Sequence, residues 1–278
     1  MRGAAASALA NCAAALTVLA LATTPPDAIA GAIGFRPDAE VTAGPGIDAK
    51  VTLTHTGDES AKNVSIRAEL LDRAIDGAAV ASIAPGQSQV WNFHLFDEIP
   101  SGSYVVVLRI RYSDANGYPF EVVSTAAATV GVKPAPGILG SVEVPRLAVN
   151  GEVTARLTAK KHPARSGSFD VRLVAPSGLV LQPDRLTLDF DPSGKATASF
   201  RVRNRELLAD TSVNVYALVS GTDAGFPQVD TIRGRVAIGA PLPRATYRMF
   251  YEAAASVALL ALALEGIAWA SARRRQSG

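Results

Sequence analysis

The chain has 278 residues, of which 48% are hydrophobic and 19% are charged, and its formal net charge is +2. This near balance argues against a nucleic-acid-binding protein, because such proteins concentrate unpaired Lys and Arg side chains on one surface. The single cysteine, Cys12, lies in an apolar stretch at the N-terminus. If that stretch is removed, the mature protein has neither a disulfide framework nor a thiol nucleophile.

The first 30 residues have the pattern of a secretory signal peptide. Arg2 supplies a short positive start, residues 4–22 are apolar, and Ala28 and Ala30 are small residues at the positions that a signal peptidase recognises. We expect cleavage after Ala30. The alternative is an uncleaved signal anchor formed by the same residues.

Residues 31–132 are expected to form a first β-sandwich domain. Apolar residues alternate with polar ones in the runs 50–54, 64–70 and 104–112. This period of two is typical of strands with one face in a core and the other in water. Short turns rich in Gly, Pro, Asn and Asp separate the runs, as in an all-β sandwich.

The strand that begins at Tyr104 has a predicted inner and outer face. Tyr104 would face the core, whereas Arg109 and Arg111 would lie in water. Tyr104 has two interpretations: a plain aromatic core residue, or a tyrosine corner whose hydroxyl binds backbone near the start of the strand. Asn116 and Gly117 then predict a type I′ hairpin turn, because both residues tolerate positive φ.

Two stretches of this first domain resemble a known family. Residues 99–117 read IPSGSYVVVLRIRYSDANG, similar to the PGxYxVxVxVxYxDxxG run of Ig-like modules in bacterial and archaeal surface proteins, the cell-adhesion-related (CARDB-like) group. Residues 57–64 resemble the turn and strand NxGxxxAxNV of such modules, with His55 and Thr56 in place of the usual Asn. The resemblance covers residues 40–130 and implies an Ig-like spacer, adhesive unit or accessory domain without catalytic residues.

A second domain follows the connector 133–137, which reads KPAPG. Alternating runs at 153–157, 169–173 and 198–203, again separated by turns, predict a second Ig-like sandwich over 138–241. The expected fold class is therefore all-β, with two tandem Ig-like β-sandwiches between a signal peptide and one C-terminal transmembrane helix. We expect few contacts to cross the connector.

Residues 253–272 predict a transmembrane helix. They are apolar apart from one charge, and about 20 residues cross a bilayer as a helix. Arg273, Arg274 and Arg275 follow, and the positive-inside rule therefore places the tail 273–278 in the cytoplasm. The chain before the helix would lie in the periplasm or on the cell surface.

The charged residue within this span is Glu265. A carboxylate near the middle of a bilayer costs about 2.5–3.5 kcal/mol on insertion scales. Glu265 is either a protonated passenger or a contact with a partner helix, which the adjacent Gly266 would allow to approach closely. Ahead of the span, the juxtamembrane segment 242–252 begins with LPRAT, which starts like a sortase signal but differs at the fourth and fifth positions. We therefore expect anchoring by the helix itself.

Residues suited to catalysis or metal binding are sparse. His55, His94 and His162 lack the paired spacing of a zinc site. Asp189 and Asp191 flank Phe190 and have ligands for calcium, but turns favour the same residues. We expect no catalytic residue, no metal and no cofactor, and we interpret the protein as a non-enzyme.

A basic loop offers a candidate surface contact. Lys160, Lys161 and Arg165 would bind an acidic glycan or lipid headgroups, or would simply be solvated. Together these patterns predict a type I single-pass membrane protein whose extracytoplasmic domains act as a binding, adhesive or scaffolding module with protein partners and no nucleic acid. The alternative is a non-catalytic accessory subunit of a membrane enzyme or export complex, and a carbohydrate-binding module ranks third.

Overall fold

The computed structural model describes residues 32–44, 46–131, 137–163, 168–223 and 225–239. The predicted signal peptide, juxtamembrane segment, transmembrane span and cytoplasmic tail lie outside these residues. The described part of the chain is all-β, which confirms the predicted fold class at that level. It contains no helix able to cross a membrane.

The first sandwich packs a three-stranded sheet against a second sheet centred on β3 and β7. The smaller sheet has the order β1-β2-β6, with bounds Phe35–Ala43, Ile47–His55 and Ser88–Phe96. In the other sheet β3 pairs with β4, β5 and β7, and β7 pairs with β8. These strands are β3 Ala61–Leu70, β4 Arg73–Asp76, β5 Val80–Ile83, β7 Gly102–Ser113 and β8 Pro119–Val130.

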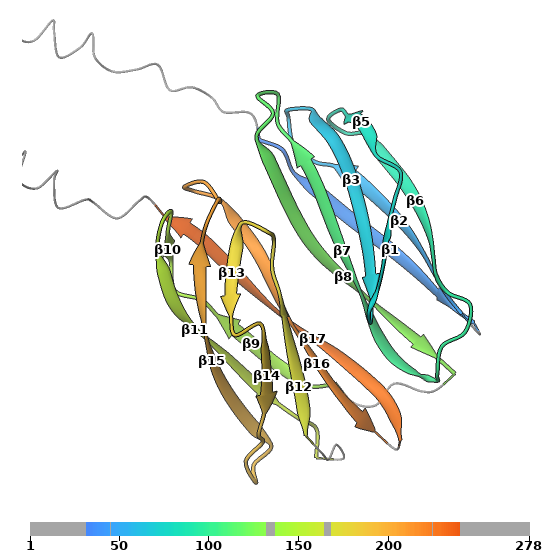
Figure 1. Ribbon diagram of the computed structural model, residues 1–278, viewed down its shortest axis with the longest axis vertical. Helices are drawn as coiled ribbons and strands as arrows, with labels where there is room; N and C mark the ends of the chain where they lie inside the picture. Colours follow the sequence, from blue (N-terminus) through green and yellow to red (C-terminus); the bar gives the residue numbers. More distant parts are fainter. Residues whose placement is uncertain (1–31, 45, 132–136, 164–167, 224, 240–278) are drawn as a thin grey trace, which may run out of the picture.

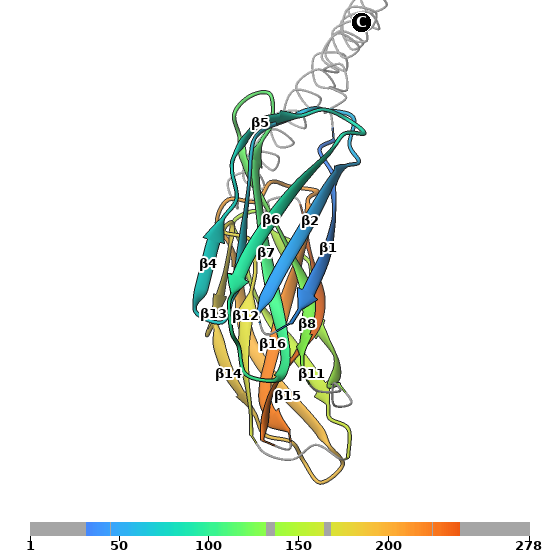
Figure 2. The same cartoon turned by 90° about the vertical axis from the view of Figure 1, so that its right-hand side faces the viewer.

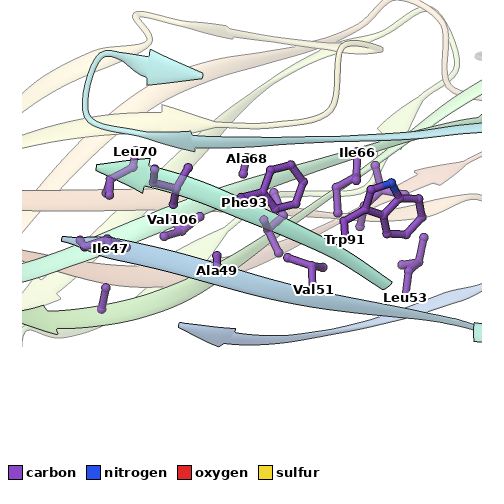
Figure 3. Close-up of a cluster of buried hydrophobic side chains, with 14 of the residues drawn as sticks. Ile47, Ala49, Val51, Leu53, Ile66, Ala68, Leu70, Trp91, Phe93 and Val106 are labelled. Atoms are coloured by element: carbon purple, nitrogen blue, oxygen red, sulfur yellow. The ribbon is translucent and has the colours of Figure 1, made fainter. Parts of the chain in front are cut away.

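The core of the first sandwich follows from the predicted alternation. Every second residue of β2 is fully buried, and the aromatic rings of Trp91 and Phe93 extend from β6 toward β3 (Figure 3). The indole N–H of Trp91 donates a hydrogen bond of 2.7 Å to the carbonyl oxygen of Ala78, so this buried donor is satisfied. Burial of this apolar face is the main term that holds the two sheets together.

The second sandwich has two sheets of four strands each. One has the order β13-β15-β11-β9 and the other β17-β16-β12-β14, with a single bridge between β9 and β17. The short strand β10 pairs with β17. The bounds are β9 Leu139–Glu143, β10 Leu147–Ala148, β11 Glu152–Lys160, β12 Phe169–Val174, β13 Leu179–Gln182, β14 Arg185–Leu188, β15 Lys195–Asn204, β16 Ser212–Asp223 and β17 Phe226–Gly239.

The two sandwiches lie side by side rather than end to end (Figure 1). The start of β1 and the end of β17 lie at one end of the pair, the upper end in Figure 1, whereas β8 ends and β9 begins at the opposite end. After a quarter turn, one sandwich lies in front of the other (Figure 2). The chain therefore enters the first sandwich and leaves the second at the same end of the pair.

The hairpin between β7 and β8 lies where it was predicted, but its turn type was wrong. Only Gly117 has positive φ, at 80°, whereas a type I′ turn needs positive φ at two residues. The carboxylate of Asp114 accepts hydrogen bonds from the backbone N–H groups of Asn116 and Tyr118, at 2.9 and 2.8 Å. These bonds stabilise a longer loop, so a two-residue turn is not required.

Candidate functional site: the interface and groove between the sandwiches

A third apolar cluster joins the two sandwiches. It contains Val105, Val107 and Val123 from β7 and β8, and Val174, Tyr216 and Leu218 from β12 and β16. All six residues are at most 7% exposed. We call this set the interface cluster. Because it draws equally on both sandwiches, their relative position is set by burial of apolar surface.

Strand β7 supplies this contact because both of its faces are apolar over its first half. Tyr104, Val106 and Leu108 enter the core of the first sandwich, while Val105 and Val107 face the second sandwich. Strands buried on both faces have near-continuous apolar runs, and the YVVVL run of β7 is of this kind. This run is the sequence signal for the interface, and the prediction of a half-buried strand was wrong for this half of β7.

Arg109 continues the outer face of β7, and its predicted placement in water was wrong. Its side chain is 21% exposed and forms ion pairs with Glu69 at 2.8 Å and Glu121 at 2.7 Å. One terminal nitrogen also donates to the carbonyl oxygen of Ala175 in the second sandwich, at 3.0 Å. Arg111, which is 55% exposed, pairs with the other carboxylate oxygen of Glu121.

The ion pairs of Arg109 set its electrostatic environment. Burial by itself lowers the pKa of Arg109, but the hydrogen bond to Glu121 and the charges of Glu69 and Glu121 raise the pKa by more. Arg109 therefore stays charged and can donate to both carboxylates and to the backbone of the second sandwich. Since its five N–H donors have a fixed fork geometry, Arg109 also fixes orientation across the interface.

Two tyrosine hydroxyls add hydrogen bonds across the interface. The hydroxyl of Tyr216 in β16 donates to the carbonyl oxygen of Val123 at 3.2 Å, and that of Tyr118 donates to the carbonyl oxygen of Glu206 at 2.5 Å. Burial raises the pKa of Tyr216, so its hydroxyl remains a donor at neutral pH. By contrast, Tyr104 donates to Pro100 within the first sandwich, at 2.6 Å. That bond confirms Tyr104 as a tyrosine corner.

The sandwiches also contact each other where β7 begins. Ser103 and Gln228 form the single bridge between β7 and β17. A Cβ added to Gly102 would lie 2.5 Å from the carbonyl oxygen of Pro227. Only glycine leaves room for this approach. Gly102 therefore helps to join the sandwiches, a role that the sequence alone does not suggest.

A groove of about 530 Å³ opens beside the interface cluster. From the first sandwich it is lined by Leu70, Leu71, Asp72 and Val105, where the turn between β3 and β4 faces the second sandwich. The second sandwich contributes residues of β12, β14, β16 and β17: Asp170, Val171, Arg172, Arg185, Leu186, Thr187, Leu218, Ser220 and Val229. Its size lies in the range of small-molecule pockets.

The site residues predicted from sequence do not converge in the described part of the chain. Lys160 is exposed at the end of β11, and the Lys161 ammonium lies 5.9 Å from the centre of the Phe190 ring. Arg165 lies outside the described residues, as do the predicted anchor and assembly residues Glu265, Gly266, Arg273, Arg274 and Arg275. Their proposed roles stay predictions.

Of the two carboxylates considered as calcium ligands, Asp191 serves a turn. Asp191 accepts hydrogen bonds from the backbone of Lys195 at 2.9 Å and from the hydroxyl of Ser193 at 2.7 Å, and these bonds lower the pKa of Asp191. Across the residues that the structure describes, no group of three or more His, Cys, Asp or Glu side chains is arranged to hold a metal.

His94 lies on the outer surface of the first sandwich. Its Nδ1 lies 2.7 Å from Asp48 and its Nε2 lies 2.8 Å from Asp97. The hydrogen bonds to Asp48 and then Asp97 raise the pKa of His94. Because all three side chains are more than half exposed, this cluster is a solvated surface feature.

Comparison with known proteins assigns no family. No family model and no curated protein matches the chain. Similar solved structures include native alpha-2-macroglobulin of Escherichia coli, with 10% identity over 75% of this chain and 17% of that chain, at a TM-score of 0.31. A red sea bream transglutaminase has 11% identity over 73% of this chain and 31% of that chain, at 0.27.

A protein of unknown function from Porphyromonas gingivalis W83 is also similar. It has 13% identity over 75% of this chain and 99% of that chain, at a TM-score of 0.27. By contrast, the present chain spans only 17% of the Escherichia coli macroglobulin chain. The resemblance to CARDB-like modules stays a prediction.

Proposed function

We propose that this protein is a non-enzymatic envelope protein, anchored in the cell membrane by residues 253–272, whose two Ig-like sandwiches act as one extracytoplasmic binding or scaffolding unit. The observation that carries the proposal is the interface between the sandwiches. Apolar burial, the hydrogen bond from Arg109 to the carbonyl oxygen of Ala175 and two tyrosine hydrogen bonds join them side by side. A joined pair can display a shared surface to a ligand or partner, which two loosely linked beads cannot.

The path of the chain indicates which end of the sandwich pair a membrane span would hold. The end of β17 and the start of β1 lie at the same end of the molecule (Figure 1). A membrane span that follows β17 in sequence would bring this end toward the bilayer. The opposite end and the groove would then be available to partners outside the cytoplasm.

Membrane topology is the first test. The full-length protein, tagged at its C-terminus, should stay in the membrane fraction after extraction at alkaline pH. Protease added to spheroplasts should digest both sandwiches and leave the tag protected. Release at alkaline pH, or a tag digested together with the sandwiches, would contradict the proposed anchoring.

The second candidate is a non-catalytic accessory subunit of a membrane enzyme or export complex, assembled through the helix. The specific observation in its favour is Glu265, a costly charge within an apolar span that has Gly266 beside it. Gentle solubilisation and affinity purification separate the two candidates. A stoichiometric membrane partner favours the subunit, whereas a protein that purifies alone favours an independent binding module.

A further inference from the structure

The groove beside the interface cluster contains two arginines that directly oppose each other. Arg172 of β12 and Arg185 of β14 are antiparallel partners, which places their Cβ atoms about 4.5–5.5 Å apart. Like charges in this position destabilise a sheet. Within the described part of the chain, neither guanidinium forms a hydrogen bond or an ion pair.

The wall beside these arginines is apolar. Leu218 is the partner of Arg172 on its other side, and both line the groove with Val105 from the first sandwich. An anion held by the two guanidiniums would therefore have an apolar surface next to it. This arrangement suits a ligand with one charged end and an aliphatic body.

Leu71 completes the apolar wall from the turn between β3 and β4. It is 50% exposed and has a φ of 53°, a left-handed conformation that is rare for a residue other than Gly, Asn or Asp. A single exposed leucine needs no explanation, but this one also has a strained backbone and lies at the edge of the groove. Strained residues of this kind cluster at ligand sites.

Two carboxylates limit the charge of the ligand. Asp72 and Asp170 also line the groove, and Asp170 accepts a hydrogen bond of 3.2 Å from the Thr187 hydroxyl. They would repel a dianion such as a phosphate monoester more strongly than a single carboxylate. A singly charged head group fits best between the arginine pair and these aspartates.

From these observations we propose that the groove binds an aliphatic carboxylate, with its carboxylate held by Arg172 and Arg185 and its chain lying against Leu71, Val105 and Leu218. Arginine binds carboxylate through paired, charge-assisted hydrogen bonds, which are stronger than neutral ones. The charge of the bound carboxylate would also reduce the repulsion between the two opposed guanidiniums. This inference rests on the proposed binding role, but it is independent of the membrane anchoring.

Equilibrium dialysis of radiolabelled hexanoate tests the proposal, with the full-length protein in lipid nanodiscs and empty nanodiscs as the blank. Hexanoate should bind saturably, while hexylammonium should not. Shortening the probe to butanoate should weaken binding about threefold to fourfold for each methylene removed. Hexyl phosphate should bind more weakly than hexanoate.

Matched variants locate the site. Arg172→Gln and Arg185→Gln should each weaken hexanoate binding at least about tenfold. Arg156→Gln, an exposed strand arginine on β11 away from the groove, should leave binding unchanged. Leu71→Gln, at a half-exposed turn, gives a second check and should reduce the chain-length dependence.

Several results would overturn the proposal. These are equal binding of hexylammonium, tighter binding of hexyl phosphate, unchanged affinity in both groove arginine variants, or no saturable binding by a folded protein. None of them would bear on topology, which the alkaline extraction and protease experiments measure separately. Failure of the carboxylate site is thus distinguishable from failure of the proposed anchoring.

Discussion

His55 stabilises the turn that follows β2. Its Nδ1 atom accepts a hydrogen bond of 3.1 Å from the backbone N–H of Gly57. An Asn side-chain oxygen makes the same type of bond to a residue two positions on. The imidazole is 1% exposed and packs edge-on to Phe35, while its Nε2 has no hydrogen-bond partner in the described structure.

We predict that His55→Ala lowers the free energy of unfolding by about 2–4 kcal/mol, because it leaves a cavity and removes the acceptor for Gly57. His55→Asn should cost less, since it retains the acceptor. His94→Ala, on the exposed surface, should change stability by less than about 0.5 kcal/mol. Urea unfolding followed by far-UV circular dichroism measures all three. Equal losses for Ala and Asn at position 55 would contradict the turn role of His55.

We predict that the first sandwich loses stability at high pH, as Tyr112 ionises. Burial raises the pKa of Tyr112 to about 12, because the phenolate would lose its hydration between Phe35 and Phe120. The folded pKa lies above the unfolded value of about 10. The resulting stabilisation, about 2–3 kcal/mol, is therefore complete below pH 10 and is lost as pH rises toward 12.

Unfolding by urea between pH 8 and 12 measures this dependence. Tyr112→Phe should flatten the part of the curve between pH 10 and 12, although Tyr104 and Tyr216, whose pKa values burial also raises, would leave a residual slope. An unchanged slope in Tyr112→Phe would show that Tyr112 does not titrate with unfolding.

At the scale of elements, β7 is the strand that decides the architecture. Side chains on one face pack in the core of the first sandwich. On the other face, Val105, Val107 and Arg109 contact the second sandwich. The alternation of the sequence correctly placed the inner face. It did not identify the outer face, because an exposed strand and a strand covered by another domain differ only in what packs on them.

We predict that Val107→Lys separates the sandwiches. Val107 is fully buried in the interface cluster, so a lysine there would force a charged and longer side chain into this apolar contact. The desolvation cost is several kcal/mol, even with Glu69 opposite it on β3. The core of each sandwich would remain intact. Small-angle X-ray scattering should report a larger radius of gyration, and calorimetry should resolve two thermal transitions in place of one.

Val90→Lys is the matched control. Val90 is 42% exposed on β6 and takes no part in the interface cluster, so the same substitution should leave both the scattering and the thermal transition as in the wild type. A compact Val107→Lys protein with a single transition would show that the interface cluster does not join the sandwiches.

At the scale of the whole molecule, two separate features bear on assembly. The two sandwiches form one joined unit, and the stretch 253–272, which the sequence predicts to span the membrane, contains a charge that a simple anchor does not need. The first feature favours an independent binding module. The second favours a subunit held to a partner helix.

We predict that Glu265→Leu leaves membrane insertion intact or improved, because it removes the insertion penalty of the carboxylate. The same change should lower the yield of a co-purifying partner or homo-oligomer, since a polar contact between helices is lost. Native-gel mobility and the set of co-purifying proteins measure the effect. If both match the wild type, Glu265 is a tolerated passenger and the helix is only a tether.

The sequence alone determined the all-β class and the inner faces of the strands. Those properties follow from local periodicity and turn chemistry, which act over a few residues. It also identified the tyrosine-corner alternative for Tyr104. The turn type at Asn116 was wrong because the deciding hydrogen bonds come from the Asp114 side chain.

Only the tertiary structure decided how the two sandwiches meet. The opposition of Arg172 and Arg185, the placement of Arg109 beside Ala175 and the groove all depend on residues far apart in sequence. In the sequence, Arg109, Arg172 and Arg185 each look like an ordinary exposed arginine in an alternating strand. Their roles arise because a second sheet covers that face, removes water and brings distant side chains together, and no local pattern encodes which exposed face will be covered.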